Sequence, residues 1–123
     1  MSLRDAMRAS AAQYLGPGEP VQAVIGAQTA SQWLAAITGV FVFLGFNRYR
    51  ILAVTPTRIV VLDAGKTSFK KARGVVMDLP RSTRLGPATG LWHQIPAGQE
   101  TLRVHRRFFK DIETADSYIT ASA

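Results

Sequence analysis

A run of fourteen residues without a charged side chain, Trp33 to Phe46, most constrains what this chain can become. As a helix it would extend about 21 Å at 1.5 Å per residue, short of the roughly 30 Å hydrocarbon layer of a membrane. As a strand it would be apolar on both faces and would need cover on both. A single membrane-spanning helix is therefore disfavoured. A hydrophobic protrusion, a segment packed within the domain or against the N-terminal helix, and a self-association surface remain.

The residues after this run favour the protrusion. Arg48 and Arg50 occupy alternate positions of an expected strand and should point the same way. Trp33 and Tyr49 would then lie at interfacial depth, with the two arginines facing lipid headgroups. We therefore predict a membrane- or partner-binding insertion at residues 32–47. The membrane- or partner-binding residues, in the insertion and directly after it, would be Trp33, Leu34, Ile37, Val40, Phe41, Val42, Phe43, Leu44, Phe46, Arg48, Tyr49 and Arg50.

The positive charge of the chain is concentrated in its middle. The net charge is +7, and the stretch from Arg48 to Lys110 holds thirteen Lys and Arg against three acids. Such a block predicts attraction to phospholipid headgroups, nucleic acid or an acidic protein face, the alternative being a solvated surface that keeps the protein soluble. Two basic clusters stand out, at 69–73 and 103–110. The candidate anion-binding residues are Lys70, Lys71, Arg73, Arg103, Arg106 and Arg107.

The residue inventory argues against catalysis. Cysteine is absent, His93 and His105 are the only histidines, and no metal-ligand spacing or nucleophile elbow occurs. The sequence GPATG at 86–90 lacks the Lys-Ser/Thr ending of a phosphate loop and indicates a turn. We therefore expect no enzyme activity, no cofactor and no metal. Because Asp5 interrupts the basic N-terminus and no apolar signal region follows, we expect a cytoplasmic protein.

The elements expected from the pattern form one β-rich domain. Ser2 and Asp5 suggest a capping box for an amphipathic helix over residues 3–15, and Asp111 can cap a second helix near the C-terminus. Between them, short β-branched runs with Pro and Gly punctuation predict an antiparallel sheet, and DAGK at 63–66 predicts a turn. Seven strands are expected, over 21–29, 48–55, 58–62, 74–79, 81–85, 91–95 and 101–109.

Two stretches resemble the bacterial pleckstrin-homology-like (PH-like) domains. GEPV at 18–21 opens the first strand, and RYRILAVTPTRIVVLDAG at 48–65 is similar to the strand pair of that family, with a T-x-x-R corner at Thr55 and Arg58. The resemblance covers Gly18 to Ile119. It implies a bent seven-stranded antiparallel half-barrel, plugged by a C-terminal helix and acting as a non-enzymatic binding module. The division would be an N-terminal amphipathic helix at 1–17 and a PH-like domain at 18–121.

The resemblance does not extend to a full phosphoinositide signature. Arg48-Tyr49-Arg50 matches the basic-x-Arg part early in the second strand, but Gln22 and Gln28 stand where the first strand would carry a lysine. The sequence therefore predicts a module that docks at the inner face of the cell membrane, on anionic lipid or a membrane-protein complex. A homo-oligomer is a further partner it allows. The alternative is a soluble β-barrel that binds nucleic acid through residues 103–110 and 69–73.

Overall fold

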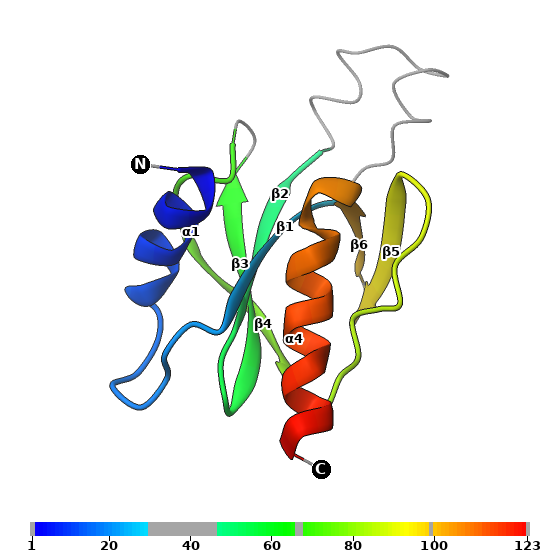
Figure 1. Ribbon diagram of the computed structural model, residues 1–123. Coiled ribbons are helices and arrows are strands. Elements are labelled where there is room, and N and C mark those ends of the chain that lie inside the picture. The colour runs from blue at the N-terminus through cyan, green and yellow to red at the C-terminus, as the bar shows by residue number, and fades with distance from the viewer. Residues whose placement is uncertain (1, 30–46, 66–67, 99, 123) are drawn as a thin grey trace.

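The computed structural model describes residues 2–29, 47–65, 68–98 and 100–122. Within these ranges, six antiparallel strands form one sheet in the order β4-β3-β2-β1-β6-β5, and the sheet curls into a half-barrel (Figure 1). The strands are β1 (Ala23–Gln28), β2 (Tyr49–Val54), β3 (Arg58–Gly65), β4 (Gly74–Pro80), β5 (Trp92–Ala97) and β6 (Glu100–His105). Helix α1 (Leu3–Ala12) precedes them, and a 3₁₀ turn η1 (Arg106–Phe108) leads into helix α4 (Phe109–Ser122).

The mainly β architecture with a helix at each end is confirmed, but the expectation of seven strands is wrong for the described residues. The strand expected over 81–85 is a turn followed by a loop. Here the backbone N–H groups of Leu85 and Gly86 donate to the carboxylate of Asp116 in α4, at 2.9 and 3.0 Å, rather than to a neighbouring strand. Pro80 and Pro87 have no N–H to donate at all. The Asp116 side chain thus accepts the backbone hydrogen bonds that a seventh strand would have made with a neighbouring strand.

The first helix begins as its sequence predicts. The Ser2 side chain accepts a hydrogen bond from the N–H of Asp5, and the Asp5 carboxylate accepts one from the N–H of Ser2, which completes a capping box. The helix ends at Ala12, three residues earlier than expected. Met7 and Ala11 are fully buried and belong to the same apolar core as the strands, so α1 is part of the domain's packing.

The central strands form the core. Every residue of β1 is buried, and β2 is buried from Arg50 onward, so both faces of the sheet are covered there. The β1–β2 register pairs Gln28 with Tyr49 and Gly26 with Ile51, and these four residues share one face because side chains alternate along a strand. The opposite face carries Ile25 and Leu52, together with Arg50.

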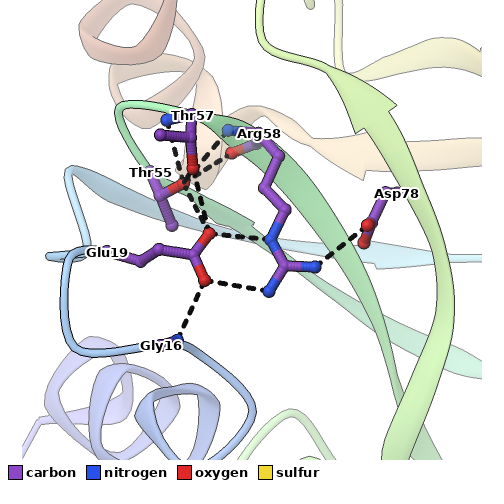
Figure 2. Close-up of polar contacts among 6 residues, drawn as sticks. All are labelled: Gly16, Glu19, Thr55, Thr57, Arg58 and Asp78. Carbon is purple, nitrogen blue, oxygen red and sulfur yellow. Dashed lines mark hydrogen bonds and ion pairs between the residues drawn. The ribbon is translucent and has the colours of Figure 1, made fainter.

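The two stretches that carry the PH-like resemblance meet in space (Figure 2). The Glu19 carboxylate receives hydrogen bonds from Arg58 Nε and Nη2 at 2.7 and 2.9 Å, and Arg58 Nη1 donates to Asp78 at 2.9 Å. The Gly16 N–H and the Thr57 hydroxyl also donate to Glu19. The loop after α1 is thereby fixed to the corner between β2 and β3.

No helix in the described part of the chain is long and apolar enough to cross a membrane.

Candidate anion-binding pocket

A pocket of about 450 Å³ lies where β1 ends and β2 begins. Three of its lining residues form a row across neighbouring strands: Tyr49 of β2 pairs with Gln28 of β1, and Gln28 pairs with Arg103 of β6. The register places all three on the same face of the sheet. Among the described residues, the lining consists of Leu3, Gly26, Gln28, Tyr49, Ser68, Phe69, Lys70, Trp92, Arg103, His105 and Arg107.

Arg103 is fixed on this face by main-chain oxygens. Its Nη1 donates to the carbonyl of Thr29 at 2.6 Å, just beyond the end of β1. Its Nε is buried and has no hydrogen-bond partner among the residues that the structure describes. The guanidinium is therefore held in place without an anion to neutralise it.

Arg107 reaches the pocket because β6 stops at His105. His105 caps the 3₁₀ turn, and its Nδ1 accepts a hydrogen bond from the Arg107 N–H at 3.1 Å. The Arg107 guanidinium carbon then lies 5.4 Å from the centre of the Phe69 ring and 5.1 Å from that of Phe108. Cation–π contacts with two rings restrict this side chain while leaving its N–H groups able to donate elsewhere.

Helix α1 positions both basic clusters. The Ser10 hydroxyl accepts a hydrogen bond from the N–H of Ala72, and the Tyr14 hydroxyl donates to the Ala72 carbonyl, which fixes the segment that carries Lys70. At the other end of the helix, Arg4 Nη2 donates to the carbonyl of Arg107 at 2.6 Å. Clusters far apart in the sequence are thus held beside one pocket by α1 and by Tyr14, two residues after its end.

The positive charge of the pocket is uncompensated by carboxylates. Five of the chain's eight acids pair with three arginines that lie outside the pocket lining, Arg4, Arg50 and Arg58. Asp5 and Asp116 accept hydrogen bonds from backbone N–H groups, and Glu113 is exposed on α4. All eight acids lie within the described residues, and none lines the pocket. Lys70, Arg103 and Arg107 therefore share a site with no side-chain counterion.

The predicted anion-binding residues divide into two groups. Lys70, Arg103 and Arg107 line the pocket, together with Tyr49, one of the predicted membrane- or partner-binding residues. The exposed Lys71, Arg73 and Arg106 lie outside the lining. The expected strand over 101–109 would have placed Arg103, His105 and Arg107 on one face. The strand is shorter, but the 3₁₀ turn brings Arg107 to the same pocket as the other two.

The two arginines after the apolar run are placed differently from each other. The main chain of Arg48 exchanges hydrogen bonds with Thr29, each 3.0 Å long, so the described residues before and after the predicted insertion lie side by side. The Arg50 side chain is only 10% exposed and binds Asp63 at 2.7 Å and Glu100 at 3.0 Å. The expected orientation of Arg50 toward headgroups is therefore wrong, because two carboxylates occupy its guanidinium. Residues 33–46 of the insertion lie outside the described residues.

Several residues of the pocket could not be predicted from the sequence. Trp92 and His105 face each other across β5 and β6, with ring centres 5.2 Å apart, and Phe69 packs edge-on against Tyr49 at 4.7 Å. Strand alternation within 101–105 indicates the face of His105. No local signal shows that β6 pairs with β1, and this pairing is what brings His105 and Trp92 next to Tyr49 and Gln28.

The side chains that line the pocket can bind an anion next to an apolar group. The lining offers two guanidinium groups, one ammonium group and aromatic rings, which can hold an anion and an apolar group. In the part of the chain that the structure describes, no group of three or more His, Asp or Glu side chains could hold a metal ion. Comparison with protein-family models, curated proteins and solved structures finds no match for this chain.

Proposed function

We propose that this chain is a non-enzymatic binding module of PH-like architecture that docks on the anionic inner surface of the cell membrane. The observation that carries the proposal is the position of the uncompensated positive charge. Gln28 and Tyr49, two residues of the pocket lining, stand five positions before and three positions after the apolar segment 33–46. An apolar segment and a cluster of cations at one site are the combination that favours adsorption to an anionic bilayer.

The apolar segment would supply insertion, and the cations would supply attraction. Each Lys or Arg near an anionic membrane surface contributes roughly 1 kcal/mol, and this contribution is screened by salt. Arg50 contributes to the fold instead, because it is paired with two carboxylates. The pairing of Thr29 with Arg48 supports the proposal, because the residues that flank the apolar segment lie beside each other at the edge of the pocket's strands.

Vesicle sedimentation tests the proposal. We expect the protein to pellet with phosphatidylglycerol vesicles but not with phosphatidylcholine vesicles, and to be released as sodium chloride rises because surface charges are screened. Replacing both Val42→Asp and Leu44→Asp should abolish pelleting while circular dichroism and the melting temperature stay unchanged. Failure of the parent protein to pellet with either lipid would refute docking on lipid.

A matched variant controls for the added negative charge. Val75 and Leu91 are 53% and 54% exposed, and neither lies near the apolar segment in sequence. Val75→Asp with Leu91→Asp changes the net charge by the same amount and should leave pelleting nearly intact. Unfolding of the Val42→Asp, Leu44→Asp variant would show that the segment belongs to the core. Salt-sensitive binding of a single-stranded oligonucleotide, without any vesicle binding, would favour the nucleic-acid alternative instead.

A further inference from the structure

The pocket has features that membrane adsorption does not require. Adsorption needs only exposed cations and an apolar segment, but Lys70, Arg103 and Arg107 all line one partly open pocket of about 450 Å³. Small-molecule sites typically have volumes of about 300–1,000 Å³ and combine apolar walls with a few placed polar groups. The volume and the lining of this pocket match that description.

The charged side chains of the pocket indicate the sign of the ligand's charge and the chemical type of the ligand. Among the described residues, two arginines and one lysine line a space without carboxylates, and the Arg103 Nε is buried without a hydrogen-bond partner. Arginine binds phosphate and carboxylate oxygens through paired N–H groups. A phosphomonoester carries about two negative charges at neutral pH, so it matches three cations better than a single carboxylate does.

The aromatic residues select the rest of the ligand. Tyr49 and Trp92 are only partly buried, on opposite sides of the Gln28–Arg103 row, and the lining also includes Phe69 and His105. A flat ring stacks on such side chains, and stacking on an aromatic residue is worth roughly 1–3 kcal/mol per nucleic-acid base. We propose that the pocket binds a small organic anion in which a phosphomonoester is joined to a planar ring, of the size of a mononucleotide.

This inference uses the same pocket cations as the proposed membrane docking, but all of its residues are described and nucleotide binding is measured without vesicles. Trp92 provides the signal: the chain has two tryptophans, so a Trp33→Phe background leaves Trp92 alone in the fluorescence spectrum. The probes are adenosine 5′-monophosphate, adenosine, ribose 5-phosphate and inorganic phosphate. We expect the nucleotide to change Trp92 emission saturably and to bind at least roughly tenfold more tightly than any of the other three.

Neighbouring residues provide matched variants. All four residues are exposed, but Lys70→Gln and Arg107→Gln each remove a cation that lines the pocket, whereas Lys71→Gln and Arg106→Gln remove a cation one position away, outside the lining. We expect the pocket variants to weaken nucleotide binding by about tenfold or more, the loss typical of a charge-assisted hydrogen bond. The neighbouring variants should change it by less than about twofold, as expected for screened surface charges. Circular dichroism and melting temperature verify that all four fold.

Three results would overturn the inference. The first is no saturable response to the nucleotide; the second is equal weakening by pocket and neighbouring variants, which would show a diffuse electrostatic surface. The third is binding of an oligonucleotide far more tightly than the nucleotide, with all four variants weakened, which would indicate a nucleic-acid interface. A protein that binds the nucleotide but never pellets with vesicles would keep this inference and lose only the proposed docking on lipid.

Discussion

At the scale of single residues, Glu19 has the most perturbed carboxylate of the chain among the groups described. Hydrogen bonds from Arg58, and then one from the Gly16 N–H, lower the pKa of Glu19 from 4.5 to about 2, and the same ion pair raises the pKa of Arg58 (Figure 2). A carboxyl group with a lowered pKa in the folded state stabilises the fold above its unfolded pKa. This stabilisation is lost as the pH falls from about 4.5 toward 2.

Glu19→Gln tests this linkage. We expect the variant to have a lower free energy of unfolding at neutral pH, because Arg58 keeps only Asp78 as a charged partner. Its stability should also fall less between pH 4.5 and pH 2, since the group that takes up the proton is gone. Urea unfolding at a series of pH values measures both effects.

Glu113→Gln is the matched control, because Glu113 is exposed and makes no ion pair among the described residues. It should follow the parent's pH profile. Identical acid profiles for the parent and for Glu19→Gln would contradict the lowered pKa. The sequence marked both GEPV and the T-x-x-R corner, but the ion pair that joins them spans 39 positions and has no local signal.

At the scale of elements, Gly26 sets how closely η1 approaches β1. A Cβ at this position would lie 2.8 Å from Phe108 Cε2 and 3.0 Å from Phe69 Cδ1. Glycine within a strand often marks such a close approach of another group to the backbone. The buried Phe108 ring thus lies directly against the strand, and it also contacts Phe69 edge-on at 5.7 Å.

Gly26→Ala should therefore destabilise the fold by about 1–3 kcal/mol, the usual cost of inserting a methyl group into a packed core. Gly74→Ala is the control: Gly74 begins β4, and a Cβ there would meet no atom within 4 Å. It should be neutral or slightly stabilising. Chemical denaturation measures both. Equal stability of the two variants would mean that Phe108 and Phe69 move aside easily, whereas recovery in a Gly26→Ala, Phe108→Leu double variant would identify the clash.

The elements were predictable where local patterns decide them. β-branched runs marked the strands, and the capping box marked α1, because these features depend on near neighbours along the chain. Two predictions were wrong because the structure of the segment depends on hydrogen-bond partners that are distant in the sequence. The main-chain donors of Leu85 and Gly86 bind Asp116, and β6 gives way to a 3₁₀ turn whose first N–H donates to the carbonyl of Leu91. Neither partner is visible in the local sequence.

At the scale of the whole molecule, strand order determines which charges meet. The basic residues of the candidate site could be predicted from the sequence, but their position beside one pocket could not. The 69–73 and 103–107 clusters lie close together only because β1 pairs with β6 and because α1 binds both segments. The same order places Arg50 of β2 within reach of Asp63 of β3 and Glu100 of β6. In the sequence, Arg50 is one of two arginines beside an apolar run. The carboxylates that bind Arg50 lie 13 and 50 positions away along the chain, so the local sequence does not reveal them.

Arg50→Gln distinguishes a structural role from a role at the membrane. The change leaves Asp63 and Glu100 without their cation, so we expect the free energy of unfolding to fall by about 1–3 kcal/mol, below the full cost of breaking a buried pair because both carboxylates remain partly hydrated. Arg106→Gln removes the same charge from an exposed position and should stay within about 0.5 kcal/mol of the parent.

Urea unfolding and vesicle sedimentation, measured on the same samples, separate the two roles. If Arg50 ties β2 to β3 and β6, its variant is less stable, yet its folded fraction pellets with phosphatidylglycerol vesicles as much as Arg106→Gln does. If Arg50→Gln is instead as stable as Arg106→Gln and loses pelleting more strongly, the Arg50 guanidinium leaves its carboxylates to bind headgroups. In that case the orientation expected from the sequence would describe the membrane-bound form.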